Sequence, residues 1–231
     1  VQPLRYGENP HQRAAFYRDP DAAGANIATA RVLQGKELSY NNIIDADAAL
    51  QLVLEFEEPA CVAIKHTNPC GAAVADGPLA AFRKARLCDP VSIFGGIVAF
   101  NREVDEATAN EMKEVFLEIV IAPRFSPAAL ELYGSSQKLR NVRLLEVDLG
   151  GVDRRRQELE LRKVLGGLLV QTRDCEPLDA PARKVVTRRH PTEREQRAMD
   201  FAWRVAKHVK SNAIVLASED SLIGVGAGQM S

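Results

Sequence analysis

The feature that most constrains the fold is the alternation of short apolar runs with segments whose apolar residues recur at helical spacing. Apolar runs of strand length lie at 61–64, 97–100 and 119–122, and 142–147 is expected to be a further strand. The helical segments lie at 45–56, 79–85, 105–116 and 126–132. Strands that alternate with helices predict a layered α/β domain, and a run that is apolar on both faces is typical of a parallel sheet.

Several expected helices carry recognisable start signals. Ser126 precedes Pro127, which suits a cap followed by proline in the first turn. Thr192 and Glu195 have the spacing of a capping box and open a predicted helix over 192–209. The acidic first turn of the 105–116 segment suits a helix dipole.

The polar, Arg-rich stretch 148–156 is the expected boundary between two parts of the chain, which places the domains at 1–150 and 151–231. The other expectations concern the ends and the second part: an irregular segment over 1–31, a loop over 65–71, a strand over 163–171, a loop with a short strand over 174–189, and a hairpin of 213–217 with 222–225.

Composition excludes several classes of protein. Lys and Arg total 30 against 31 for Asp and Glu, so a general affinity for nucleic acid or an anionic membrane surface is not expected. Apolar runs stay far below the roughly 20 residues of a membrane-spanning helix. The four cysteines form no C-x-x-C pair and no signal peptide is visible, which favours reduced thiols in the cytoplasm. Because the chain begins at Val1 and stops at Ser231 after a glycine-rich turn, we expect a piece of a longer polypeptide.

Lys65 and His66 form the first candidate site, because they follow a buried strand and enter a polar loop. Ligands of open α/β sheets gather outside the carboxyl ends of strands. A histidine there can accept a proton near neutral pH, and a lysine can stabilise developing negative charge. From spacing alone, a solvated pair at a strand end is the more frequent situation, since histidine is often only half-buried.

The segment after His66 argues against a zinc deaminase. Such enzymes use H-x-E followed by P-C-x-x-C. Here Asn68 stands where the glutamate would be, and Ala73 stands where the second cysteine would be. No metal site is therefore expected, and Cys70 is interpreted as a small buried core residue.

Other polar segments are ambiguous when each is taken alone. The segment 5–12 contains Arg5, suited to a phosphate, and Tyr6, suited to stacking, but it is equally a frayed terminus. The segment 39–42 suits a helix cap. Phe94 precedes the glycine pair Gly95–Gly96, which permits close backbone approach to a ligand or simply makes a turn. A dinucleotide loop at 224–228 is rejected, because the glycine spacing is wrong.

Together these segments resemble the AICAR transformylase family of purine synthesis, in family order along nearly the whole chain. The matching motifs are R-Y-G-E-N-P-H-Q (5–12), S-Y-N-N-I-x-D-A (39–46), A-I-K-H-T-N-P-C-G (63–71), D-P-V-S-x-F-G-G-I-V-A (89–99), F-L-E-I-V-I-A-P (116–123), K-S-N-A-I-V-L-A (210–217) and G-x-G-A-G-Q-M-S (224–231).

The resemblance implies two cytidine-deaminase-like, three-layer α/β/α lobes without zinc, the second lobe incomplete. It implies formyl transfer from 10-formyltetrahydrofolate, as co-substrate, to the 5-amino group of AICAR, giving formyl-AICAR for IMP synthesis without a metal. The family is homodimeric with sites at the subunit interface. Its IMP cyclohydrolase domain would precede Val1, and an arginine with the rest of the second lobe would follow Ser231.

The resemblance also implies roles for single residues. The family's catalytic lysine and histidine fall on Lys65 and His66. Its nucleotide contacts fall on Arg5, Tyr6, Asn42 and Asn212, and the acidic residue that reads the carboxamide side of AICAR falls on Glu118. Asn68, Phe94 and Gly95, inside the matched motifs, are the remaining expected substrate contacts.

Two other classes stay open from the sequence. One is a fragment that holds purine nucleotide without turnover. The other is an unrelated α/β nucleotide-modifying enzyme such as a deaminase, against which the missing metal ligands weigh.

Overall fold

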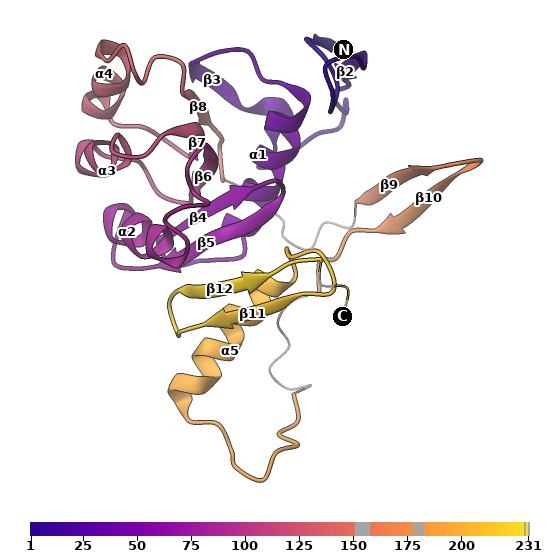
Figure 1. Ribbon diagram of the computed structural model, residues 1–231, viewed down its shortest axis with the longest axis vertical. Coiled ribbons are helices and arrows are strands. Elements are labelled where there is room, and N and C mark those ends of the chain that lie inside the picture. Colours follow the sequence, from indigo (N-terminus) through magenta and orange to yellow (C-terminus); the bar gives the residue numbers. More distant parts are fainter. Residues whose placement is uncertain (151–157, 177, 179–182, 229, 231) are drawn as a thin grey trace.

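The computed structural model describes residues 1–150, 158–176, 178, 183–228 and 230, and its main body is a mixed six-stranded sheet with helices on both faces (Figure 1). The strands, in spatial order, are β3 (Arg31–Gln34), β8 (Arg143–Glu146), β7 (Leu117–Ala122), β6 (Gly96–Phe100), β4 (Ala60–Lys65) and β5 (Asn68–Val74). Strands β6, β7 and β8 are parallel, and the other pairings are antiparallel. The predicted α/β class is confirmed.

The expected parallel pairing of residues 61–64 is wrong. Strand β4 is antiparallel to both of its neighbours, β5 and β6. It is apolar on both faces because helices cover the sheet on both sides, and not because it runs parallel. The loop expected at 65–71 is also wrong: the chain turns at His66 and Thr67 and returns at once as β5, with Lys65 opposite Asn68.

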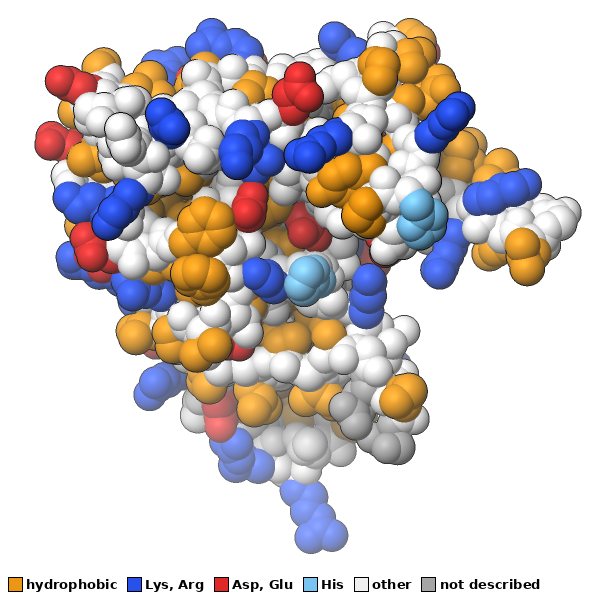
Figure 2. Space-filling view, turned by 45° about the horizontal axis from the view of Figure 1, so that its top comes forward, with side chains coloured by type: hydrophobic (Ala, Val, Ile, Leu, Met, Phe, Trp, Pro, Cys, Tyr) orange, Lys and Arg blue, Asp and Glu red, His pale blue; other side chains and the backbone are white. Residues whose placement is uncertain are grey.

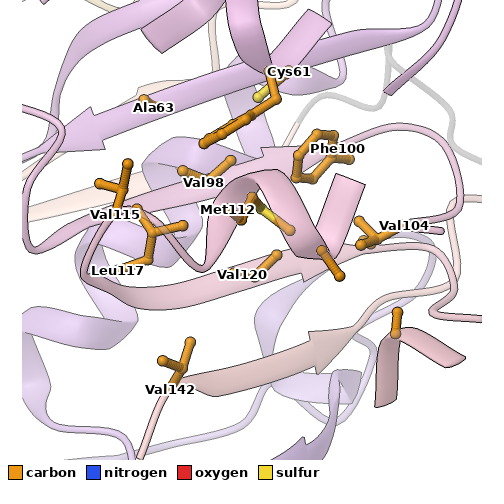
Figure 3. Close-up of a cluster of buried hydrophobic side chains, with 14 of the residues drawn as sticks. Cys61, Ala63, Val98, Phe100, Val104, Met112, Val115, Leu117, Val120 and Val142 are labelled. Atoms are coloured by element: carbon orange, nitrogen blue, oxygen red, sulfur yellow. The ribbon is translucent and has the colours of Figure 1, made fainter. Parts of the chain in front are cut away.

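The sheet lies between two layers of helices, which gives the molecule two apolar cores. Helices α2 (Pro78–Cys88), α3 (Glu106–Met112) and α4 (Pro127–Ser135) cover one face, where buried side chains such as Phe100, Met112 and Val120 pack together (Figure 3). Helices α1 (Tyr40–Val53) and α5 (Glu193–Ala206) contribute to the core on the other face. The layers follow from the sequence, because strands apolar on both faces have to be covered on both sides.

The predicted caps are confirmed. Ser126 accepts a hydrogen bond from the Ala129 amide at the start of α4, and Thr192 and Glu195 form the capping box of α5. The helix predicted over 45–56 begins earlier, at Tyr40, because Ser39 and Asn42 form another capping box. The helix predicted over 105–116 ends at Met112.

The ends of the chain contain short elements. Residues 1–31, expected to be irregular, include β1 (Gln2–Leu4), β2 (Ala14–Phe16) and the 3₁₀ helix η1 (Ile27–Thr29). The strand expected over 163–171 is two strands, β9 (Leu159–Val164) and β10 (Gly167–Thr172), which form a hairpin that projects from the body (Figure 1). The chain reverses because Gly166 adopts φ +77°, a conformation that glycine tolerates well. The described residues of 174–189 contain no strand.

The last described part packs against the first. The predicted hairpin is confirmed as β11 (Ile214–Ala217) and β12 (Leu222–Gly226). The Phe56 and Phe201 rings lie 5.2 Å apart, and the Val74 amide donates to the Asp220 carbonyl at 2.8 Å. The predicted boundary between residues 150 and 151 meets residues outside the described ones, so it stays a prediction, as does the likeness to cytidine deaminase. No helix among the described residues is long and apolar enough to cross a membrane.

Candidate functional site

The predicted site residues that belong to the six-stranded sheet lie at one end of its strands, which we call the sheet edge. Strand β4 ends there at Lys65, β5 begins at Asn68, and the parallel strands β6, β7 and β8 begin there too, since Ile64 pairs with Ile97 and Ile119 pairs with Arg143. Helix α1 begins at this edge because β3 ends beside the start of β8. The expectation that Lys65 and His66 lie at the carboxyl end of a buried strand is confirmed for β4, whereas the parallel strands β6–β8 begin at this edge and do not end there.

The turn between β4 and β5 holds His66 in an exposed position. His66 and Thr67 have φ values of 50° and 64°, in the left-handed region that L-residues, and β-branched ones above all, rarely adopt. The turn is held from outside, because the Thr67 amide donates to Asp45 Oδ1 of α1 at 2.7 Å. Such conformations persist where surroundings enforce them, and they cluster at functional sites.

Lys65 is anchored to the segment that precedes β6. Its Nζ donates to the Phe94 carbonyl at 2.6 Å, and the Gly95 amide donates to the Phe116 carbonyl at 2.7 Å. Gly95 has φ +67°, and a Cβ built there would lie 3.1 Å from the lysine nitrogen. The exposed rings of Phe94 and Phe116, 5.4 Å apart, place an aromatic surface beside the ammonium group.

Asp45 is the acidic residue that interacts directly with the β4–β5 turn. Burial raises the pKa of its carboxyl group above the ordinary value, although the hydrogen bond from Thr67 and the charges of His66, Lys65 and Lys210 act in the opposite direction. The carboxylate thus lies among three basic side chains and fixes the turn that carries His66.

The start of α1 brings Asn42 to the same edge. The Ser39 amide donates to Asn42 Oδ1 at 3.1 Å, so the carboxamide oxygen of Asn42 belongs to the capping box. The N-terminal turn approaches through Asn41, whose side chain donates to the Glu8 carbonyl at 3.3 Å. The Arg5 guanidinium lies 5.8 Å from the centre of the Tyr6 ring, so the two predicted contacts lie side by side.

Glu118 lies near the start of β7 and pairs with a residue that the sequence did not single out. Arg143 Nη1 donates to Glu118 Oε2 at 2.7 Å, and Arg143 itself is buried. Glu118 is half-buried. The carboxylate therefore has a fixed orientation at the sheet edge.

The chain after α5 reaches this edge through Lys210, whose amide donates to Asn68 Oδ1 at 3.2 Å. The Gly228 amide in turn donates to the Lys210 carbonyl at 2.9 Å, which brings in the glycine-rich end of β12. Asn212 lies two residues beyond Lys210 and is exposed. Among the described residues, no hydrogen bond or ion pair joins Asn212, Arg5 or Tyr6 to Lys65 or His66, so these three are placed near the edge only through their neighbours.

Four residues at the edge escaped the sequence reasoning as single positions. Asp45, Phe116 and Lys210 lie inside the matched motifs, so the motifs contained them without assigning them a role. Arg143 carried a signal that could have been used, namely a cationic side chain near the start of a predicted strand that is mostly apolar.

The cysteines do not form a reactive cluster. Burial raises the pKa of Cys70 to about 12 and of Cys88 to about 11, which disfavours the thiolate. Cys70 is half-buried and packs against the core, close to the predicted role of a buried core residue. Among the residues that the structure describes, no group of three or more His, Cys, Asp and Glu side chains is arranged to hold a metal ion.

A cavity lies away from this edge, at the side of α1. It has a volume of about 850 Å³ and is lined by side chains such as Asp47 and Gln51 of α1 and Leu159 of β9, and neither Lys65 nor His66 borders it. Figure 2 shows a face of the molecule on which basic, acidic and hydrophobic side chains lie close together.

Comparison with known proteins gives a consistent result along the whole chain. The profile of the AICARFT/IMPCHase bienzyme family matches residues 1–231. Similar curated proteins include bifunctional purine biosynthesis proteins PurH: that of Magnetococcus marinus is 56% identical over 233 residues, and that of Anoxybacillus flavithermus is 57% identical over 229 residues. These alignments cover 100% and 99% of this chain but 43% and 44% of the relatives, so the chain spans less than half of their length.

Proposed function

Because the chain belongs to the AICARFT/IMPCHase bienzyme family, we propose that its sheet edge carries formyl transfer, the first of the two reactions in that family name. The reaction takes the formyl group of 10-formyltetrahydrofolate to the 5-amino group of AICAR and yields formyl-AICAR and tetrahydrofolate. The observation that carries the proposal is that the β4–β5 turn, with Lys65, His66 and Asn68, lies at the same sheet edge as Glu118 of β7, which is distant from it in sequence.

The chemistry requires groups that move a proton and stabilise an oxyanion. The AICAR amine is a weak nucleophile, because its lone pair is delocalised into the ring and the neighbouring carboxamide. As its nitrogen bonds to the formyl carbon, it loses a proton to His66, which is exposed at the tip of its turn. The carbonyl electrons move to oxygen, and the Lys65 ammonium stabilises the resulting oxyanion.

Collapse of the tetrahedral intermediate completes the transfer. The carbon–nitrogen bond to the folate breaks, its electrons stay on the folate nitrogen, and that nitrogen takes up a proton. Protonated His66 can return the proton that it accepted, so the reaction needs no net proton from solvent. General acid–base catalysis supplies about 10²–10⁴-fold, and positioning of the two substrates supplies much of the remainder.

The remaining residues take binding roles in this proposal. Arg5 suits the phosphate of the nucleotide, and the Tyr6 ring beside it suits stacking. Asn42, Asn68 and Asn212 supply hydrogen bonds, and Glu118 accepts from the carboxamide of AICAR. Phe94 and Gly95 offer an aromatic surface and a close backbone approach next to Lys65.

The wider setting belongs to the same proposal. The enzyme acts in cytoplasmic IMP synthesis, uses 10-formyltetrahydrofolate as co-substrate without a metal, and works as a homodimer whose sites lie between subunits. A form of the protein that extends to the length of its relatives also carries the cyclohydrolase reaction.

The test is a reconstituted transfer reaction in a form of the protein that spans the length of its relatives. AICAR and 10-formyltetrahydrofolate are supplied, and formyl-AICAR and the IMP formed from it are followed by mass spectrometry alongside tetrahydrofolate by absorbance. Formation of tetrahydrofolate equal to the sum of formyl-AICAR and IMP, dependent on both substrates, supports the proposal. Consumption of the folate without formyl-AICAR or IMP would refute it.

A further inference from the structure

Arg143 is the one charged residue that is buried among the residues that the structure describes, with 8% of its surface exposed. It opens β8 at the sheet edge, and each of its three guanidinium nitrogens donates a hydrogen bond there. Nη1 donates to Glu118 Oε2 at 2.7 Å, Nε donates to the carbonyls of Lys36 and Glu37 at 3.1 Å each, and Nη2 donates to the Glu37 carbonyl at 3.1 Å. A buried cation requires such partners, because an unpaired one is costly to desolvate.

The partners of Arg143 lie on β7 and in the loop between β3 and α1, and both elements are next to or carry proposed substrate contacts. Glu118 is itself one of these contacts. Lys36 and Glu37 lie in the loop between β3 and α1, directly before the capping box that contains Asn42. One rigid guanidinium therefore fixes both the carboxylate and the loop that leads to Asn42.

We infer that Arg143 is a positioning residue and that the Arg143–Glu118 pair makes the site select a carboxamide over a carboxylate on the imidazole ring. The inference rests on the proposed function. Arg143 binds Oε2 of Glu118, and no hydrogen bond from the described residues reaches Oε1, which leaves that oxygen to accept from a ligand donor. An ionised carboxylate accepts hydrogen bonds and donates none, so it pairs with the N–H₂ of an amide.

A carboxylate analogue meets the opposite situation. It would bring a second anion against Glu118 with no hydrogen to share, and the charge of Arg143 is already balanced by Glu118. Discrimination of this kind comes from the repulsive contact as much as from the attractive one. The same arginine without Glu118 would favour the carboxylate, so the selectivity belongs to the pair.

The experiment measures the affinity of two probes by calorimetry in a form of the protein that spans the length of its relatives. The probes are AICAR and the analogue in which a carboxylate replaces the carboxamide. The variants are Glu118→Gln, which keeps an oxygen for Arg143 but adds a donor, and Arg143→Lys, which keeps the charge but loses the planar array of donors. Glu146→Gln is the control, since Glu146 lies on the same strand and pairs with Arg31 at 3.2 Å at the opposite end.

The wild type is expected to prefer AICAR by at least tenfold. Glu118→Gln should reduce that preference by about tenfold or more, and Arg143→Lys should reduce both the preference and the affinity for AICAR. Glu146→Gln should change neither. A purely structural role for Arg143 would lower both affinities together and leave their ratio intact, so the ratio decides.

Each contrary result has a distinct meaning. If the wild type binds AICAR and Glu118→Gln keeps the full preference, the inference is overturned while the proposed function stands. If the wild type binds neither probe, the proposed function is overturned and the inference with it. Should Arg143→Lys fail to fold, the ratio in Glu118→Gln still decides, because that variant keeps the hydrogen bond to Arg143.

Discussion

Replacement of Gly95 by alanine tests the arrangement around Lys65 most sharply. Gly95 has φ +67°, where an L-residue costs about 1–2 kcal/mol, and the lost chain freedom of the unfolded state returns about 0.4–1 kcal/mol. The net loss in free energy of unfolding is then about 1 kcal/mol. With a urea slope of about 1–3 kcal/mol per molar, the midpoint should fall by roughly 0.3–1 M.

The second effect of Gly95→Ala is local to the site. The new Cβ would lie 3.1 Å from Lys65 Nζ, closer than ordinary van der Waals contact, so the ammonium must move by a few tenths of an ångström. That shift strains its 2.6 Å bond to the Phe94 carbonyl. Since a displacement of about 1 Å can cost about 100-fold in rate, we expect formyl transfer to fall by about tenfold.

The matched control is Gly166→Ala in the β9–β10 turn. Gly166 also has positive φ, at 77°, but a Cβ there would meet no atom within 4 Å. The assay is urea unfolding followed by circular dichroism, together with formyl transfer in a form that spans the length of the relatives. Full turnover in Gly95→Ala, or an equal loss in Gly166→Ala, would refute the placement of Lys65 in the reacting centre.

Three further predictions concern charge and packing. Burial raises the pKa of Glu55, but hydrogen bonds from His208 and Lys207 outweigh burial and lower this pKa to about 2, so the stabilisation that ionised Glu55 provides is present above about pH 4.5 and lost as the pH falls toward 2. In Glu55→Gln this part of the acid dependence of urea unfolding should vanish, and its persistence would exclude the interactions of Glu55 with His208 and Lys207 as the cause. Because burial raises the pKa of Asp45, ionisation of its carboxyl group disfavours folding. Asp45→Asn keeps an acceptor for the Thr67 amide, so its free energy of unfolding should exceed that of Asp45→Ala by about 1 kcal/mol, and equal urea midpoints would speak against the hydrogen bond from Thr67. Phe201→Ala removes a buried ring from the α5 contact and should cost about 3–5 kcal/mol in thermal or urea unfolding, whereas a loss below about 1 kcal/mol would contradict its role in the core.

Much of the fold could be predicted because local signals determine it. The caps at Ser126 and Thr192 satisfy amides within one turn of the chain, so the sequence spacing alone identifies them. The α/β class could be predicted because the apolar pattern within each segment distinguishes buried strands from helices. The hairpin of β11 and β12 followed from two apolar runs around a short polar turn.

The direction of strand pairing could not be predicted. A strand covered by helices on both faces is apolar on both faces whether its neighbours run parallel or antiparallel, so β4 was assigned wrongly. The turn at His66 and Thr67 lacks the Asn-Gly or Asp-Gly pair that usually marks such hairpins. Its conformation depends on Asp45, which is distant in sequence.

The sequence predicts which motifs contain the site residues, but it does not predict that these residues lie together in the fold. Periodicity located Lys65 and His66 at the end of a strand, but only the sheet order brings Glu118 and Asn42 to the same edge. Arg143 escaped notice because its partners, the Glu118 carboxylate and two loop carbonyls, come together only in the folded chain.

The central claim is that the edge around His66 performs formyl transfer. The most direct measurement assays formyl transfer and closure of formyl-AICAR to IMP separately, in a form that spans the length of the relatives, for His66→Ala and for the exposed control His190→Ala. The account predicts that His66→Ala lowers transfer by at least about 100-fold, leaves ring closure unchanged, and that His190→Ala affects neither. Normal transfer in His66→Ala, or a loss of ring closure equal to the loss of transfer, would contradict it.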